Sequence, residues 1–419
     1  MAARVVTVPG TGQAVWRAAA VERLRAVAPA LRYCAAVYFV VRGALFVLAS
    51  AAWGLTAEPA ASMPDGQPLP LTNGWHNALT DWNREDANWY LYVAAHGYSS
   101  HDGTAVFLPG YPMLVRLVGY LCFGHLLLAA YLVSNVALLT AMVILYRLTE
   151  REYDVVTARR AVLYLAIFPA AVFLFGLYSE ALFLLFAVGA IALARQGRWG
   201  WAGLAGIGAT LTRSVGVIVA LALAVEAIHQ TAEWRRRLDG DGTSWRQTLA
   251  TAAPRLGASL LPLAGTAGYL LFWQLRFHDW YRPLGLQKTW WQRDVVPSWQ
   301  PLWHGLNLAA RSGSLGGQGW PAFDFVLVAA GLVLGIWVAV RARPVYAAYT
   351  WGCILFGLTD SFSQRPLAGD PRYLVVIFPL AWALARMSRR QGWHDAVVAC
   401  SAASLAIVSW LFLTTMSVY

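Results

Sequence analysis

The sequence predicts an all-α protein that crosses a membrane many times. Of its 419 residues, 58% are hydrophobic and only 13% are charged, whereas about 25% of the residues of a soluble globular chain are charged. The hydrophobic residues gather in long runs, and a helix needs roughly 20 apolar residues to cross the hydrocarbon core. This composition excludes a soluble enzyme, a disordered protein and a fibrous protein.

The apolar runs mark about eleven candidate spans by the length rule for membrane helices. We expect them at residues 34–54, 125–147, 159–177, 181–195, 199–212, 214–230, 256–276, 323–341, 344–361, 372–387 and 395–416. They form a single integral membrane domain over residues 1–419, with a cytoplasmic N-terminus at 1–33. Two long outer loops are expected at 54–105 and 277–321.

Two apolar segments do not fit a simple crossing. Residues 106–122 contain Pro109, Gly110, Pro112 and Arg116, and we expect a helix that lies in the outer interface. The run from 199 to 229 is too long for one span. Its interruption at Thr212-Arg213-Ser214 predicts two short helices that meet at Arg213.

The net charge of +11 follows this layout. Loops rich in Lys and Arg stay cytoplasmic, and the arginine clusters fall on predicted inner segments, among them Arg147, Arg151, Arg195, Arg198, Arg235, Arg236, Arg237, Arg341, Arg343, Arg389 and Arg390. The positive charge therefore indicates membrane topology and not binding to nucleic acid. The outer loops collect scarce acids, namely Asp81, Glu85, Asp86, Asp102, Asp279, Asp294, Asp360 and Asp370. We expect the chemistry on the outer side.

Neither the cysteines nor the histidines indicate a metal centre. The cysteines lie in or beside apolar runs without CxxC spacing, at Cys34, Cys122, Cys353 and Cys400, which argues against disulfides and zinc. The outer histidines form no HxH or HxxxH pair. No cofactor is required, and a divalent cation at Glu85 and Asp86 is compatible with the sequence without being indicated. The first apolar run shows no A-x-A-like cleavage site after a short apolar core, so we expect a retained span and not a cleaved signal peptide.

The first outer loop contains adjacent carboxylates before an amphipathic segment. After Asp86 the spacing is helical and puts Trp89, Tyr90, Val93 and Ala94 on one face, which is typical of a helix on the membrane surface. Asp86 would lie near the start of that helix, where it could cap free backbone N–H groups. Alternatively, Glu85 and Asp86 supply a general base.

Several motifs resemble those of PIG-V-like membrane mannosyltransferases. They are Asp86-Ala-Asn-Trp-Tyr-Leu with His96-Gly-Tyr98, Val106-Phe-Leu-Pro-Gly-Tyr-Pro-Met-Leu-Val-Arg116, Phe168-Pro-Ala-Ala-Val-Phe173, Tyr178-Ser-Glu-Ala-Leu-Phe183, Leu211-Thr-Arg-Ser-Val-Gly216 and Pro371-Arg-Tyr373. Gln287, Trp291 and Arg293 look like the Q-x-x-W-x-R element of the family. The sequence departs from the pattern at Glu85, where the family usually has Trp, and at Leu108 and Gly110.

The resemblance implies a GT-C glycosyltransferase with its catalytic acid in a long first outer loop. Such enzymes transfer a sugar, with inversion, from a polyprenyl-phosphate carrier to an acceptor on the non-cytoplasmic side. We therefore expect transfer of mannose from polyprenyl-phosphate mannose to a lipid or glycan acceptor. Bacteria carry related proteins, so the expected location is a bacterial plasma membrane. Asp86 is the expected base, with Glu85 and Asp81 as second choices.

The leaving phosphate needs cations, and arginine offers a permanent charge in a bidentate fork. Arg213 and Arg372 are the leading candidates, with a structural ion pair as the alternative for each. Lys288 and Arg293 follow. Glu180 either orients the acceptor or forms a salt bridge with Arg213. The other expected substrate-binding residues are Gln287, Trp291 and Tyr373.

A transporter or flippase for a polyprenyl-linked or other lipid is the alternative function. Such a protein should carry ionisable residues near the midplane of several spans and show internal symmetry. In this sequence the acids gather in loops, and no interrupted spans repeat in inverted order. An enzyme is therefore the favoured reading.

Overall fold

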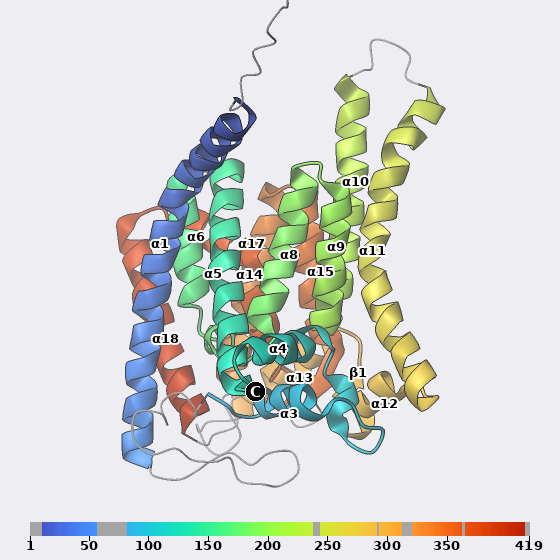
Figure 1. Cartoon of the computed structure of the whole chain (residues 1–419). Helices are drawn as coiled ribbons and strands as arrows, with labels where there is room; N and C mark the ends of the chain where they lie inside the picture. The colour runs from blue at the N-terminus through green and yellow to red at the C-terminus, as the bar shows by residue number, and fades with distance from the viewer. Residues whose placement is uncertain are drawn as a thin grey trace, which may run out of the picture.

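The computed structural model describes residues 11–56, 82–237, 244–290, 293–311, 321–362 and 365–414. Long helices lie side by side in a bundle, and short helices cross one end of it (Figure 1). The strands in the described part belong to one two-stranded sheet. The predicted all-α class is therefore confirmed.

Each predicted apolar run lies on helical structure. The bundle contains α1 (Thr11–Thr56), α5 (Leu126–Glu152), α6 (Val155–Ala166), α8 (Glu180–Arg195), α9 (Trp199–Thr212), α10 (Val217–Arg237), α11 (Trp245–Phe277), α14 (Pro321–Arg341), α15 (Pro344–Thr359), α17 (Phe378–Met387) and α18 (Gln391–Leu413). Two helices begin well before the expected residue. α1 extends back to Thr11, and α11 begins after a capping box that Ser244 forms with Gln247.

Six of the described helices are long and apolar enough to cross a membrane. They comprise Val27–Ala52 within α1, Leu126–Glu152, Ser214–Arg237, Trp245–Phe277, Pro321–Arg341 and Gln391–Leu413. The count of about eleven spans stays a prediction, because several bundle helices fall short of the roughly 20 residues that a full crossing needs. For example, α8 has 16 residues and α9 has 14.

Proline divides two of the predicted runs. The run expected at 159–177 ends as a helix at Ala166, before Pro169, and continues only as the short α7 (Val172–Phe175). The run expected at 372–387 is divided into α16 (Asp370–Val376) and α17 at Ile377, before Pro379. Proline lacks an amide hydrogen and restricts the residue before it, so a helix tends to end there.

Both unusual segments contain helices and a break where the sequence predicts them, although α10 is longer than the short helix expected. The position of the first segment in the outer interface stays a prediction. Residues 103–121 form the 3₁₀ helix η2 (Gly103–Val106) and α4 (Gly110–Leu121), and α4 lies across the end of the bundle (Figure 1). At Arg213, α9 ends and the 3₁₀ helix η3 (Ser214–Gly216) leads into α10.

The layer across this end also contains α3 (Asp86–His96), α12 (Arg282–Thr289) and α13 (Trp299–Arg311) (Figure 1). Strands β1 (Arg293–Val295) and β2 (Asp360–Phe362) pair antiparallel, with Arg293 opposite Phe362 and Val295 opposite Asp360. The sheet thus joins the second long loop to the segment that precedes α16. Three loops far apart in the sequence meet over one end of the bundle.

Candidate active site

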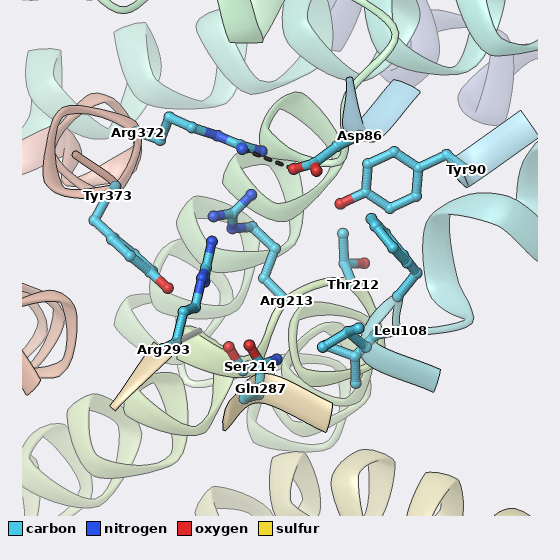
Figure 2. A pocket seen from close by; sticks show the side chains of 13 residues that line it. Asp86, Tyr90, Leu108, Thr212, Arg213, Ser214, Gln287, Arg293, Arg372 and Tyr373 are labelled. Carbon is cyan, nitrogen blue, oxygen red and sulfur yellow. Dashed lines mark hydrogen bonds and ion pairs between the residues drawn. The ribbon is translucent and has the colours of Figure 1, made fainter. Parts of the chain in front are cut away.

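A pocket lies where this end layer meets the bundle (Figure 2). Its empty space, including the part that is open to solvent, is about 660 Å³. The lining residues are Asp86, Tyr90, Val106, Phe107, Leu108, Thr212, Arg213, Ser214, Gln287, Arg293, Gly369, Arg372 and Tyr373. Asp86 is the only carboxylate among these described residues, and three of the others are arginines. The pocket therefore combines one proton acceptor with a concentration of fixed positive charge.

Asp86 is the first residue of α3. The preceding Glu85 has φ 49° and makes no side-chain capping bond. The Asp86 carboxylate instead accepts a hydrogen bond of 2.7 Å from Nη1 of Arg372. The capping role considered for Asp86 is therefore not the arrangement observed. A negative charge at this position is still favoured by the dipole of α3.

Arg372 is buried on α16 and contacts two carboxylates at once. Its Nη1 donates to Asp86, whereas its Nε and Nη2 donate to Oε1 of Glu180 at 2.9 Å and 2.7 Å. The guanidinium also lies over the rings of Phe173 and Tyr178, at 4.7 Å and 5.1 Å from their centroids. Aromatic faces stabilise a desolvated cation, so these rings fix Arg372 from a further direction.

Arg213 enters the pocket because the chain is extended between α9 and η3, with φ −146° and ψ 146°. Its Nη1 lies 2.6 Å from Oε1 of Glu180 and donates at 3.4 Å to Oγ of Ser179. The guanidinium lies 5.5 Å from the centroid of the Tyr373 ring. The helix break seen in the sequence thus turns a charged side chain toward the pocket.

Arg293 reaches the pocket from β1 and donates to Oδ2 of Asp360 at 2.8 Å. Tyr373 donates to the same oxygen at 3.2 Å. Burial lowers the pKa of Arg293, but the adjacent Asp360 carboxylate outweighs it, and the pKa lies above its usual value. Arg293 therefore stays charged. Figure 2 shows the guanidinium groups of Arg213, Arg293 and Arg372 pointing toward one another.

Tyr90 lies one helical turn after Asp86 on α3 and also lines the pocket. Its hydroxyl shares a hydrogen bond of 2.8 Å with Oγ of Ser179. Burial, together with the charges of Glu180 and Asp86, raises the pKa of Tyr90. The hydroxyl therefore stays protonated.

The structure brings together most of the residues singled out from the sequence. Those that line the pocket are Asp86, Arg213, Gln287, Arg293, Arg372 and Tyr373. Glu180 lies behind it and bridges two of the arginines, so of its two expected roles the salt bridge is the one observed. Glu85 does not line the pocket. Lys288, 78% exposed, pairs at 3.2 Å with Asp294. Asp81 and Trp291 lie outside the described residues.

Three further residues at the site, Tyr90, Ser179 and Asp360, were not among the predicted site residues. The spacing of Tyr90 from Asp86 places both on one face of a helix, and this signal could have identified Tyr90. The partnership of Asp360 with Arg293 depends on the pairing of β1 with β2, which no local pattern reveals. Among the described residues, no group of three or more His, Cys, Asp or Glu side chains is arranged to hold a metal ion.

Several solved structures are similar to this chain. One is the oligosaccharyltransferase of Archaeoglobus fulgidus in complex with Zn and sulfate, with 14% identity and a TM-score of 0.43 over 90% of this chain and 53% of that one. Another is ArnT from Cupriavidus metallidurans bound to undecaprenyl phosphate, with 15% identity and a TM-score of 0.46 over 94% of this chain and 76% of that one. The chain thus spans about half the length of the oligosaccharyltransferase.

The sequence itself matches a family model. Residues 38–233 match the family described as Mannosyltransferase (PIG-V), and none of the curated proteins compared with the chain has a similar sequence. The matched region includes Asp86, Glu180 and Arg213, whereas Arg293 and Arg372 follow it. The matched residues make up a little under half of the chain, and over that region the match confirms the predicted resemblance to PIG-V-like mannosyltransferases.

Proposed function

We propose that this glycosyltransferase moves mannose, with inversion, from a polyprenyl-phosphate-mannose donor to a lipid or glycan acceptor. The observation that carries the proposal is the convergence of Asp86 with Arg213, Arg293 and Arg372 in one pocket. Such a transfer needs one group that accepts a proton and others that stabilise the charge of a departing phosphate. The described pocket supplies both kinds of group.

The proposed reaction is a single displacement at the anomeric carbon. The acceptor hydroxyl attacks the anomeric carbon from the side opposite the phosphate, and its oxygen forms the new glycosidic bond. The bond between that carbon and the phosphate oxygen breaks, and its electron pair leaves with polyprenyl phosphate. The proton of the hydroxyl passes to the Asp86 carboxylate. Negative charge therefore grows on the phosphate as the reaction proceeds.

The arginines are suited to that growing charge. A guanidinium presents several N–H groups in a fixed plane and keeps its charge, and preorganised donors aimed at developing charge give large rate gains. Arg372 already donates through Nη1 to Asp86. A phosphate that takes over this donor would leave the Asp86 carboxylate available for the proton of the acceptor.

The charge distribution supports a pocket on the non-cytoplasmic side and a cytoplasmic N-terminus. Arg195 and Arg343 share the buried Glu226 at 3.1 Å and 3.0 Å. Arg195 ends α8, which begins at Glu180 beside the pocket, so this cluster lies at the opposite end of the bundle. Arginine-rich ends tend to stay in the cytoplasm, and this supports a pocket on the outer side.

A transfer assay tests the proposal. The purified protein is given polyprenyl-phosphate mannose with candidate acceptors, and wild type is compared with Asp86→Asn. Loss of a general base should lower kcat by about 100- to 10,000-fold. The exposed Asp279, which lies at the same end but does not line the pocket, supplies the control Asp279→Asn. Equal transfer by wild type and Asp86→Asn would remove Asp86 from the mechanism. If wild type transfers sugar to no acceptor, the transporter alternative is favoured.

A further inference from the structure

Glu180 connects two of the pocket arginines through a single oxygen atom. Oε1 accepts from Nε and Nη2 of Arg372 at 2.9 Å and 2.7 Å, and it lies 2.6 Å from Nη1 of Arg213. Glu180 itself is 0% exposed and does not line the pocket. Its contacts therefore act on substrate only through the two arginines.

Glu180 does not bind every nitrogen of the two guanidinium groups. Arg372 binds Glu180 through its Nε and Nη2, so its Nη1 points away from that anchor, toward Asp86. Arg213 is additionally held by Ser179 and lies over the Tyr373 ring. Because Arg372 has an anchor other than Asp86, it can stay in place when Asp86 exchanges partners. The anchoring side and the side that faces the pocket are different parts of the same guanidinium.

Two guanidinium groups placed side by side repel each other unless a negative charge lies between them. Each long side chain also loses rotamer entropy when it is fixed. Glu180 offsets both the repulsion and the loss of rotamer entropy before substrate arrives. It is the first residue of α8, and this rigid helix holds it at a fixed position. Functional groups held by rigid elements and by supporting hydrogen bonds keep the productive geometry.

We propose that Glu180 is the positioning residue of the phosphate site. It sets Arg213 and Arg372 side by side, so that both present N–H groups to one phosphate once Nη1 of Arg372 exchanges Asp86 for that phosphate. This inference rests on the proposed function, since it takes the donor phosphate as the ligand of both arginines. The ligand chemistry is a phosphate ester on a lipid.

The same bundle contains a matched control for a merely structural ion pair. Glu226 on α10 is also 0% exposed and is also shared by two arginines, Arg195 and Arg343. It does not line the pocket. If buried glutamates between arginines served only stability here, Glu180→Gln and Glu226→Gln would behave alike.

The experiment uses the full chain in detergent, with undecaprenyl phosphate as the binding probe and sugar transfer as the second readout. We expect Glu180→Gln to lower kcat by about 100-fold, the effect of a displacement of about 1 Å in a catalytic constellation, and to weaken binding of the probe. Glu226→Gln should lower Tm and leave both readouts near wild type. Equal effects of the two substitutions on binding and transfer would overturn the proposal.

A double-mutant cycle tests whether Glu180 acts through Arg213. Residues that share a hydrogen-bond network give non-additive effects. Arg213→Gln should therefore weaken probe binding strongly in wild type and much less in the Glu180→Gln background. Full additivity would overturn the positioning role. If Glu180→Gln does not fold, Glu180→Asp takes its place, because it keeps the charge but lacks one methylene of reach. Binding by Glu180→Asp as tight as wild type would also overturn it.

The outcomes separate this inference from the proposed function. If Arg213→Gln and Arg372→Gln both bind undecaprenyl phosphate as tightly as wild type, the arginines do not hold the phosphate and both proposals fail at that point. If both arginine variants bind weakly and Glu180→Gln binds like wild type, only the positioning role fails.

Discussion

Asp86 and Arg372 form an ion pair of 2.7 Å although 286 positions separate them in the sequence. The pair joins the start of α3 to α16 and lies in the pocket. It places the expected proton acceptor in direct contact with an expected phosphate ligand. In the proposed mechanism these two groups act on opposite sides of the same anomeric carbon, so the direct contact between them must open when the substrate enters.

Replacing Arg372 by lysine tests the need for a planar fork. Lysine keeps the charge but offers one ammonium group, which cannot reproduce donation to Glu180 from Nε and Nη2 and to Asp86 from Nη1. We expect kcat in the transfer assay to fall by about 100-fold. The exposed Arg276 at the same end provides the control Arg276→Lys, which should retain activity. Wild-type rates with Arg372→Lys would show that charge alone suffices.

Local patterns were sufficient to predict the helices but not their partners. The apolar runs placed helical segments, and the break at Thr212-Arg213-Ser214 predicted the junction of α9 with η3 and α10. Pro169 and Pro379 could have predicted where two apolar runs divide into separate helices. Proline removes a backbone hydrogen bond of the helix, whatever the hydropathy of the residues around it.

The site was harder to predict because its contacts are non-local. Asp86 and Arg372 could each be chosen from motifs, yet nothing in either segment shows that the two touch. The pairing of β1 with β2, which brings Arg293 to Asp360, joins two loops of irregular sequence. A strand of three residues leaves almost no periodic signal. Tertiary packing, not propensity, decides such contacts.

Substitution of Gly110 by alanine tests how closely α4 must approach the segment that contains Arg213. A Cβ at this position would lie 2.8 Å from both the backbone oxygen of Leu211 and Oγ1 of Thr212, closer than packed atoms tolerate. Gly110→Ala must therefore displace the end of α9, and we expect kcat to fall by about 10- to 100-fold through Arg213. Gly189→Ala is the control, since its Cβ would meet nothing within 4 Å. Equal rates for the two variants would contradict this account.

Substitutions of Glu85 test how much stability an unusual backbone conformation beside Asp86 costs. Its φ of 49° and ψ of −119° suit glycine far better than a residue with a Cβ, and such strain costs about 1 to 3 kcal/mol. We expect Glu85→Gly to have a higher Tm than Glu85→Ala, a comparison in which both variants lack the original side chain. Because Glu85 does not line the pocket, Glu85→Gly should keep transfer activity. Loss of transfer in both variants would point to a role for the carboxylate.

Cysteine labelling tests on which side of the membrane the pocket lies. His101 is exposed near η2 at the pocket end, and Arg236 is exposed near the end of α10, which begins beside the pocket and runs away from it. Cys34, Cys122 and Cys353 are buried, so only the exposed Cys400 needs replacement in the described part of the chain. In intact cells an impermeant thiol reagent should label His101→Cys and leave Arg236→Cys unlabelled until lysis, because arginine-rich ends stay in the cytoplasm. The reverse pattern would place the pocket, and with it the transfer reaction, on the cytoplasmic side.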